Sequence, residues 1–363
     1  MSSPFSAHSP LPEGFVLDVY CFERVLGSPG AFGTTYAARD TKAGTRLAIK
    51  ELFPRDLVMR DPDLHVHPQS AEEAGHFQEA MRMFRYEADV LSRVKHENVV
   101  RVLDYFEANG TGYMVMEYHE GYDLSRHFTM QKPGRLNENE LRKLILPLLD
   151  GLEAVHALNY LHRDIKPTNI YLTRGHRPLL LDFGAARQMV VSRSRPVTTI
   201  LTAPFAPFEQ YGTSIPQGPW TDIYAMGCVM FEALISVDEL PPSPNRLGED
   251  TLVPLSHRMR GQEYSDNLLA AIDWSLQVNP QDRPQTIAAW REVLQGSAPV
   301  PRPLFVPVSG SAGPSMPALP SASAADQAKK RRTMWIIAGV AALFLLFLFV
   351  VIAVVAAIWY FHK

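Results

Sequence analysis

An uncharged, apolar run near the end of the chain most narrows what this sequence can fold into. Thr333 to Phe361 contains no charged residue. At a rise of about 1.5 Å per residue, a helix over this run exceeds the roughly 30 Å hydrocarbon core of a bilayer and can span it with some tilt. The alternative, a buried helix of a soluble domain, is disfavoured by so long an apolar run. We therefore predict one transmembrane helix over residues 333–361.

The residues beside this run predict its orientation. Four positive residues, Lys329 to Arg332, precede it, whereas only His362 and Lys363 follow it. Because Lys and Arg are enriched on the cytoplasmic side of membrane spans, the N-terminal part of the chain is expected in the cytoplasm. The sequence thus predicts a single-pass protein of the cell (inner or plasma) membrane, with the lipid bilayer as one partner.

Composition divides the preceding residues into three zones. Residues 1–14 are rich in Ser and Pro without periodicity, which predicts a flexible N-terminal arm. Residues 15–295 mix apolar and charged residues as a globular domain does. Residues 296–332 are rich in Pro, Ala and Ser and end in the basic cluster, so we expect a linker that cannot form a core.

Charge and cysteine content disfavour a nucleic-acid-binding protein and a protein built on disulfides or a cysteine-bound metal. Residues 326–363 carry five Lys and Arg against one Asp, which leaves 30 against 37 acidic residues in 1–325. A nucleic-acid-binding protein usually has the opposite balance, so no nucleic-acid partner is expected. Cys21 and Cys228 are too few and too far apart to predict a disulfide framework or a metal cluster, and they favour a reducing compartment.

A dense polar cluster lies between apolar residues in "YLHRDIKPTNIYL", residues 160–172. Asp164 stands between Arg163 and Lys166, and Asn169 follows five positions after Asp164. Together these side chains could take a proton, steady a phosphate and ligate a hard cation. Such a set is suited to phosphoryl transfer, provided that the rest of the chain binds a nucleotide.

Two upstream segments could bind that nucleotide. "FERVLGSPGAFGTTYAARD", residues 22–40, predicts two strands around a glycine-rich turn, although a glycine hairpin without a ligand is the more frequent explanation of such a turn. Lys50 follows in the apolar strand "LAIKE", where an ammonium group is costly unless it meets an anion. Glu87, in the helical pattern of "FRYEADVLSRV", can supply a carboxylate; taken alone it reads as a solvated helix position.

The order of these and further motifs resembles that of the eukaryotic-type (Hanks-type) serine/threonine protein kinases, in their bacterial branch. The resemblance extends from about Phe22 to Leu294. It implies an α+β, bilobal protein kinase fold, with a small β-rich N-lobe at about 15–117 and a larger helical C-lobe at about 118–295. The matching motifs are the glycine-rich loop, "AIK" (48–50), Glu87, "VMEY" (115–118), "HRDIKPTN" (162–169), "DFG" (182–184), "APFE" (206–209), "WTDIYAMG" (220–227) and "DRP" (282–284).

The resemblance implies ATP and Mg²⁺ as cofactors, with Mn²⁺ as an alternative ion. Lys50, held by Glu87, would bind the α- and β-phosphates, and Asn169 and Asp182 would ligate the metal. The implied ATP-binding residues are Gly27, Gly30, Gly33, Val25, Ala48, Lys50, Met116, Glu117, His119 and Asp123. For Asp123, a contact with the ribose and a helix N-terminal cap are equally good interpretations.

The same resemblance implies a role for individual residues of the polar cluster at 160–172. Asp164 would orient the acceptor hydroxyl and take its proton, and Lys166 would steady the γ-phosphate. Lys166 two positions after Asp164 resembles the serine/threonine pattern. Arg163 resembles a family residue whose positive charge often stays unpaired until a phosphate is added to the activation segment, here "SRSRPVTTILTAPF" (192–205). Thr198 and Thr199 are the candidate phosphorylation sites and Thr202 a substrate contact, unless these hydroxyls only decorate a loop.

Two features depart from the family pattern. The three loop glycines stand three apart instead of following Gly-x-Gly-x-x-Gly, and Pro29 lacks an amide donor, which puts nucleotide affinity in question. "APFE" is one residue longer than the usual tripeptide. We still expect structural roles for three residues. Glu209 and Arg283 would form an ion pair, and Asp222 would brace the catalytic loop at residues 162–169. Residues 54–81 read as a surface extension without chemistry.

The sequence as a whole predicts a membrane-tethered serine/threonine protein kinase that acts on protein Ser/Thr hydroxyls. It would also autophosphorylate its activation segment, in trans if copies associate. The alternative is a pseudokinase scaffold that binds nucleotide or partner proteins without efficient transfer, supported only by the altered glycine loop. A small-molecule phosphotransferase is disfavoured by the long activation segment.

Overall fold

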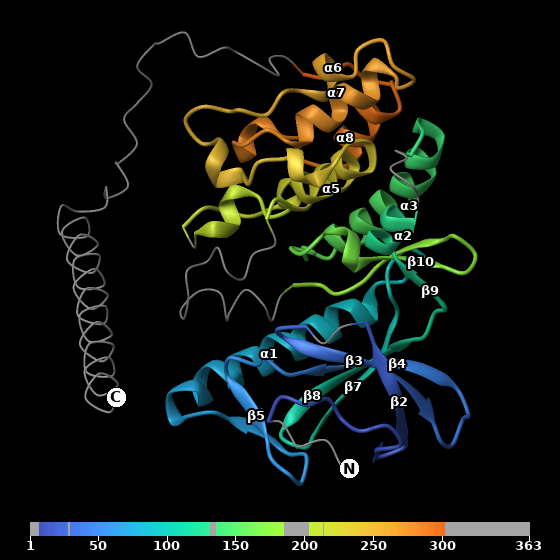
Figure 1. The fold of residues 1–363 in the computed structure, drawn as a ribbon, viewed down its shortest axis with the longest axis vertical. Helices are drawn as coiled ribbons and strands as arrows, with labels where there is room; N and C mark the ends of the chain where they lie inside the picture. Colours follow the sequence, from blue (N-terminus) through green and yellow to red (C-terminus); the bar gives the residue numbers. More distant parts are fainter. Residues whose placement is uncertain (1–6, 28–29, 131–135, 185–202, 213, 302–363) are drawn as a thin grey trace, which may run out of the picture. The chain divides into compact units, whose positions relative to one another are not determined.

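The computed structural model describes residues 7–27, 30–130, 136–184, 203–212 and 214–301, which form a β-rich lobe followed by a helical lobe (Figure 1). This confirms the bilobal fold expected from the motif order. The first lobe contains one six-stranded sheet in the order β1-β2-β3-β4-β8-β7, with every neighbouring pair antiparallel. Its strands are β1 (Val16–Leu17), β2 (Tyr20–Leu26), β3 (Gly33–Asp40), β4 (Arg46–Leu52), β7 (Val102–Ala108) and β8 (Thr111–Glu117).

Strand β4 shows how the sequence divides the two faces of this sheet. Leu47 and Ile49 are buried in an apolar cluster on one face, whereas Ala48 and Leu52 pack into the main core on the other. Because side chains alternate along a strand, Lys50 shares the face of Ala48 and Leu52. The neighbouring β3 pairs with β4 so closely that a Cβ at Gly33 would lie 2.2 Å from the Glu51 carbonyl oxygen, so only glycine fits there.

Helix α1 (Ala71–Arg93) covers the core face of the sheet. The Ser70 side chain caps its N-terminus by accepting a hydrogen bond from the Glu73 N–H. The buried residues Phe77, Ala80, Phe84, Ala88 and Leu91 recur every three or four positions, which forms one apolar face of the helix. Glu87 is 1% exposed on the same buried side, so it is not the solvated position that its sequence context alone would suggest.

The segment before α1 is more than the surface extension expected for residues 54–81. It forms a hairpin of β5 (Val58–Arg60) and β6 (Val66–Pro68). Arg60 is buried and donates to the Glu51 carboxylate at 2.8 Å, and the Tyr36 and Tyr113 hydroxyls donate to the same carboxylate at 2.9 and 2.8 Å. A buried polar network therefore ties the hairpin to the sheet, on the face opposite Lys50.

Residues 7–14 differ from the flexible N-terminal arm that was expected. Leu11 is 4% exposed, and its N–H donates to the Tyr36 hydroxyl at 3.0 Å. Arg60 donates to the carbonyls of Ala7 and Ser9 through its backbone N–H and its Nε, at 2.9 and 3.1 Å. Backbone groups make most of these attachments, so the side-chain sequence of the arm gave no periodic signal.

The second lobe is built around a buried helix, α5 (Pro219–Leu234). Cys228 and Phe231 on this helix are 0% exposed, and burial raises the pKa of the Cys228 thiol to about 12. A three-stranded sheet in the order β11-β10-β9 lies on the side of this lobe nearest the first lobe (Figure 1). The remaining elements are β9 (Gly121–Asp123), β10 (Ile170–Thr173), β11 (Pro178–Leu180), α2 (Leu124–Met130), α3 (Glu138–His156), α6 (Leu255–Arg258), α7 (Asp266–Ser275), α8 (Ile287–Leu294) and short 3₁₀ turns at Pro167–Asn169, Phe208–Tyr211, Val237–Glu239, Ser243–Arg246 and Pro280–Asp282.

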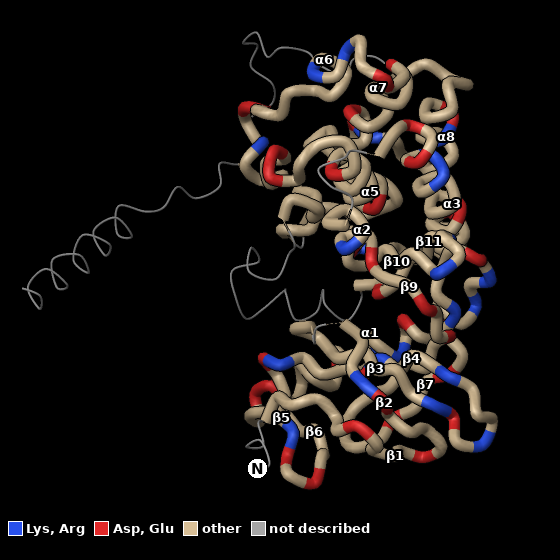
Figure 2. Tube along the Cα trace, turned by 45° about the vertical axis from the view of Figure 1, so that its right-hand side comes forward, with Lys and Arg blue, Asp and Glu red and all other residues tan. Residues whose placement is uncertain are grey.

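Lys/Arg and Asp/Glu residues are interspersed over both lobes in the view of Figure 2. In the ranges that the structure describes, no helix has the length and apolar character needed to cross a bilayer. The predicted span at 333–361 and the linker beyond residue 301 lie outside those ranges.

Candidate active site

A cleft of about 1640 Å³ is lined by residues of both lobes, and most of the predicted site residues meet in it. The first lobe contributes residues of the glycine-rich loop and β4. The second lobe contributes the segment between α3 and β10 and the residues after β11. The predicted residues that line the cleft are Gly27, Gly30, Gly33, Ala48, Lys50, Glu87, Met116, Glu117, His119, Asp123, Asp164, Lys166, Asn169 and Asp182.

Lys50 forms the link between the lobes at the centre of this cleft. Its Nζ lies 3.2 Å from Asp182 Oδ1 and 3.7 Å from Glu87 Oε1. Burial alone lowers the pKa of Lys50, but the carboxylates of Asp182 and Glu87 outweigh burial and hold the pKa above its ordinary value. Lys50 therefore stays charged, as an anion-binding group must.

Asp182 is the exposed member of this trio. Its side chain is 43% exposed toward the open cleft, whereas that of Glu87 is 1% exposed. Desolvation raises the pKa of Asp182, and the attraction of Lys50 more than offsets it, so the pKa lies below the ordinary value. An ionised carboxylate with an accessible face is what a metal ion requires.

The Asp164 carboxylate is held by two donors from its own segment. Lys166 Nζ donates to Asp164 Oδ2 at 2.9 Å, and Asn169 Nδ2 donates to the same oxygen at 2.8 Å. Asn169 Nδ2 also donates to the Asp164 carbonyl at 2.8 Å. These bonds use the amide nitrogen of Asn169. Its amide oxygen, the atom that would bind a metal ion, takes no part in them.

The donor set of the cleft fits a hard divalent cation. Asp182 and Asn169 offer a carboxylate oxygen and an amide oxygen, the ligand types that Mg²⁺ prefers. Over the residues that the structure describes, no group of three or more His, Cys, Asp or Glu side chains could hold a metal by itself. Since Mg²⁺ is usually bound by one or two protein ligands together with phosphate oxygens and water, two ligands suit it better than a complete protein cage.

Asp222, on α5, fixes the backbone that carries Asp164. Its carboxylate accepts the N–H groups of His162 and Arg163 at 2.9 and 2.7 Å, and His156 Nε2 lies 2.8 Å from it. Burial raises the pKa of Asp222, but the hydrogen bond and charge of His156 outweigh burial and lower it. Arg163 has a φ of +65°, a left-handed conformation that costs energy outside glycine, and Asp222 offsets that cost.

The residue after Asp182 joins the same assembly. Phe183 stacks on the buried His162 ring with centroids 4.2 Å apart, and the Gly184 N–H donates to the His162 carbonyl at 2.9 Å. Burial lowers the pKa of His162, and its Nδ1 accepts the Asp164 N–H at 3.4 Å. The catalytic loop and the Asp182 segment are thereby fixed to each other.

A buried ion pair joins two distant segments beneath the site. Arg283 donates to both carboxylate oxygens of Glu209, at 2.7 and 3.1 Å, and neither side chain is exposed. The Thr221 hydroxyl at the start of α5 donates to Glu209 at 2.9 Å. The structure thus brings together the pair expected from "APFE" and "DRP", and it connects that pair to the helix of Asp222.

Two predicted ATP-binding residues differ from the expectation: Val25 lies outside the cleft, and Asp123 lines the cleft and also caps a helix. Val25 does not line the cleft; it packs against the apolar cluster that contains Leu47 and Ile49, on the other face of the sheet. Its neighbour Leu26 lines the cleft instead. Adjacent strand residues face opposite sides, so the prediction was wrong by one position. Asp123 lines the cleft, and its Oδ1 also accepts the Arg126 N–H at 2.8 Å at the start of α2, which makes it a helix cap.

The regulatory residues are only partly within the described ranges. The Arg163 carbonyl accepts a hydrogen bond from Gln210 Nε2 at 2.8 Å, which links it to the turn that contains Glu209. Its Nε is buried and has no hydrogen-bond partner among the described residues. Thr198, Thr199 and Thr202 lie outside those residues.

Comparison with known proteins identifies the relatives of this arrangement. A family model of the protein kinase domain matches residues 20–296. Serine/threonine-protein kinase pkn2 of Myxococcus xanthus is 30% identical over 324 residues, which cover 83% of this chain and 36% of that protein. Serine/threonine-protein kinase PknA of Nostoc sp. is 30% identical over 285 residues, covering 75% and 46%. The chain thus spans less than half the length of these curated relatives.

Solved structures show the same fold. The apo form of PpkA-294 is 36% identical with a TM-score of 0.71, and the match covers 78% of this chain and 99% of that one. The kinase domain of PknI from Mycobacterium tuberculosis shares the fold at 22% identity and a TM-score of 0.58.

Proposed function

Because the chain belongs to the protein kinase family, we propose that it is a serine/threonine protein kinase that transfers the γ-phosphate of ATP to a protein hydroxyl. The observation that carries this proposal is the meeting of Lys50, Asp164 and Asp182 in one cleft. Serine/threonine-protein kinases among the relatives, from bacteria and from animals, support the choice of acceptor. The position of Lys166, two residues after Asp164, points the same way.

The charges in the cleft are arranged to hold a polyphosphate and a metal ion. Lys50 would bind the first two phosphates, because two carboxylates keep it charged and fix its direction. Asp182 and Asn169 would hold Mg²⁺, or Mn²⁺ in its place. ATP supplies the phosphoryl group, and the metal neutralises negative charge on the phosphates.

The base in this proposal is Asp164. Its carboxylate would accept the proton of the Ser or Thr hydroxyl as the hydroxyl oxygen attacks. The hydrogen bonds from Lys166 and Asn169 fix the carboxylate in one orientation, and Asp222 fixes the backbone beneath it. Lys166 adds positive charge next to the site where negative charge accumulates.

We also propose how the domain is located and regulated. The uncharged run 333–361 would tether it to the cell membrane, with the kinase domain on the cytoplasmic side. Phosphorylation of Thr198 or Thr199 would supply an anion for Arg163, and association of two tethered copies would allow this reaction in trans. These proposals rest on the sequence.

Phosphate transfer by the full chain tests the proposal. The chain is incubated with Mg²⁺, radiolabelled ATP and a generic protein substrate, and the labelled residues are identified after acid hydrolysis. We expect labelled Ser or Thr on the substrate and on the chain, and none with Asp164→Asn, which keeps the shape of the side chain but not its basicity. A wild-type chain that binds ATP yet labels neither protein would replace the proposal with a pseudokinase scaffold, which no observation on the described residues favours.

A further inference from the structure

Arg55 is a cleft residue that the sequence did not single out. It lies three positions after the end of β4 and lines the cleft together with five other cations. Each of those five has a partner: Lys50 with Asp182, Lys166 with Asp164, Arg24 with the Tyr118 hydroxyl, Arg46 with Glu23, and Arg126 over the Tyr122 ring. Within the described ranges, Arg55 is the cleft cation whose side chain has no hydrogen bond, ion pair or ring contact.

Strand β4 runs away from the connection between the lobes, and Arg55 follows shortly after its last residue, Leu52. Leu47, at the start of β4, pairs with Glu117, where β8 leads into the second lobe. Lys50 pairs with Met114, three residues further from that connection. Arg55 follows five residues after Lys50. If the adenine lies at Glu117 and Lys50 binds the first two phosphates, as in the proposed function on which this inference rests, Arg55 faces the end of the triphosphate.

The backbone of Arg55 is held in place on two sides. Its N–H donates to the Ala31 carbonyl of the glycine-rich loop at 3.0 Å, and its carbonyl accepts a hydrogen bond from Gln69 Nε2 at 2.8 Å. Two residues earlier, the Phe53 N–H donates to the Phe32 carbonyl at 2.9 Å. Only the side chain is therefore left to adapt to a ligand, and removing it keeps these contacts with the loop.

The glycine-rich loop itself offers fewer amide donors than its glycine content suggests. Pro29 has no N–H, and the Gly30 N–H is already donated to the Gly33 carbonyl at 2.9 Å. Backbone amides are the usual phosphate ligands of such loops, so a loop that lacks two of them needs another donor. A guanidinium group carries five N–H donors and binds phosphate through two at once.

From these observations we propose that Arg55 binds the terminal phosphate of ATP and compensates for the donors missing from the glycine-rich loop. Arg55 is then a specificity-determining residue, because it contacts a group that ATP has and ADP lacks. Asp56, the next residue, also lines the cleft, and its negative charge acts on the same phosphate in the opposite direction.

Nucleotide binding by the full chain tests this assignment. Affinities for a non-hydrolysable ATP analogue and for ADP are measured by calorimetry with Mg²⁺ present. We expect Arg55→Ala to weaken binding of the ATP analogue about tenfold and binding of ADP by less than about twofold, since one charge-assisted contact is lost. Arg55→Lys should lose less, and Asp56→Asn should tighten binding of the ATP analogue.

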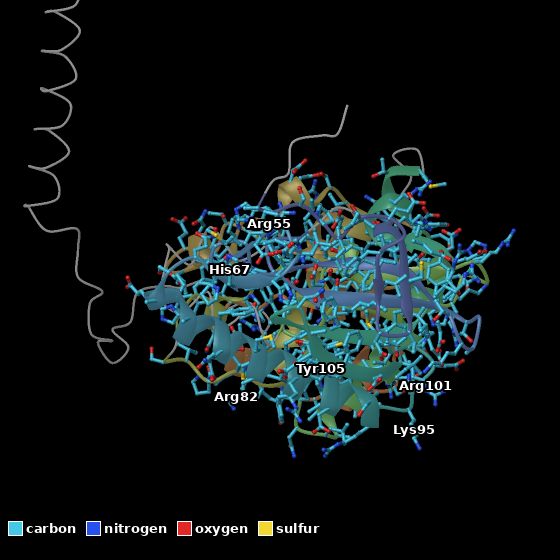
Figure 3. All side chains as sticks on the ribbon, turned by 90° about the horizontal axis from the view of Figure 1, so that it is seen from below. Arg55, His67, Arg82, Lys95, Arg101 and Tyr105 are labelled. Carbon is cyan, nitrogen blue, oxygen red and sulfur yellow. The ribbon has the colours of Figure 1, made fainter. Side chains whose placement is uncertain are left out.

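Arg82→Ala is the matched control. Arg82 is an exposed arginine on α1, and Figure 3 shows it toward the opposite edge of the first lobe from Arg55. We expect it to leave both affinities unchanged. An equal loss of both nucleotides in Arg55→Ala, or no loss of either, would overturn the inference while leaving the proposed function intact. If the wild-type chain binds neither nucleotide, the proposed function fails and this inference fails with it.

Discussion

Removing one partner of the buried pair of Arg60 and Glu51 should destabilise the first lobe strongly. Arg60 is 2% exposed and Glu51 is not exposed at all. Besides its bond to Glu51, Arg60 donates to the Ser9 and Leu64 carbonyls at 3.1 Å each, so one side chain connects the N-terminal arm, the β5–β6 hairpin and the sheet. Arg60→Met keeps the length of the side chain and removes all three contacts.

The expected cost follows from the burial of Glu51. Removing one partner of a buried ion pair costs about 3–5 kcal/mol, because the other charge is left buried. The two tyrosine hydroxyls still donate to Glu51, so we expect the lower end of this range, about 3 kcal/mol. For the domain at residues 20–296, with an unfolding entropy of about 2.1 cal/mol/K per residue, the midpoint of thermal unfolding should then fall by about 5 °C.

Thermal unfolding of the full chain at neutral pH, followed by intrinsic fluorescence, provides the assay. Arg82→Met is the control, since the side chain of Arg82 is 68% exposed and solvent screens its ion pair with Glu79. Glu51→Gln, introduced into Arg60→Met, removes the uncompensated charge and should restore part of the loss. If Arg60→Met and Arg82→Met unfold at the same temperature, the reasoning about the buried pair is wrong.

Three further predictions concern single residues. Burial, with the nearby charge of Asp238, raises the pKa of Glu232 to about 7, so the folded state disfavours its ionised form. The resulting loss of folding free energy is absent below the unfolded pKa near 4 and complete above about pH 7, where it reaches up to about 3 kcal/mol. Glu232→Gln should therefore raise the midpoint of thermal unfolding at pH 8 and change it little at pH 5. An equal effect at both pH values would contradict this. Asp222→Asn places an N–H₂ group against a backbone donor and should slow phosphate transfer on the order of 100-fold at saturating ATP, with nucleotide affinity nearly unchanged. Leu26→Ala should weaken nucleotide binding about tenfold in calorimetry, whereas Val25→Ala should not; the reverse result would restore the original assignment of Val25.

Lys50 could be predicted because it is a charged group in an otherwise apolar strand. Such a position is costly for a charge unless it meets a partner, so the residue type itself carries information. Glu87, in contrast, reads alone as a solvated helix position, and only its pairing with Lys50 within the motif order made it a candidate. The bilobal fold followed from the order of these motifs along the chain.

What could not be predicted depends on contacts between distant residues. Val25 and Leu26 are both apolar strand residues, and nothing in the local sequence shows which one faces the cleft, because a shift of one position exchanges the faces. Arg60 occurs in a polar segment that looks solvated, and only its ion pair with the buried Glu51 explains its burial. Arg55 became a candidate only when the structure placed it against the glycine-rich loop.

The most direct test of the site is whether Mg²⁺ and nucleotide bind to it together. Nucleotide affinity of the full chain is measured with Mg²⁺ and with a chelator, for the wild type and for Asp182→Asn. If Asp182 and Asn169 hold the metal against the phosphates, Mg²⁺ strengthens binding to the wild type and has little effect on the variant. An equal response to Mg²⁺ in both proteins, or a wild-type chain that binds no nucleotide, would contradict the account.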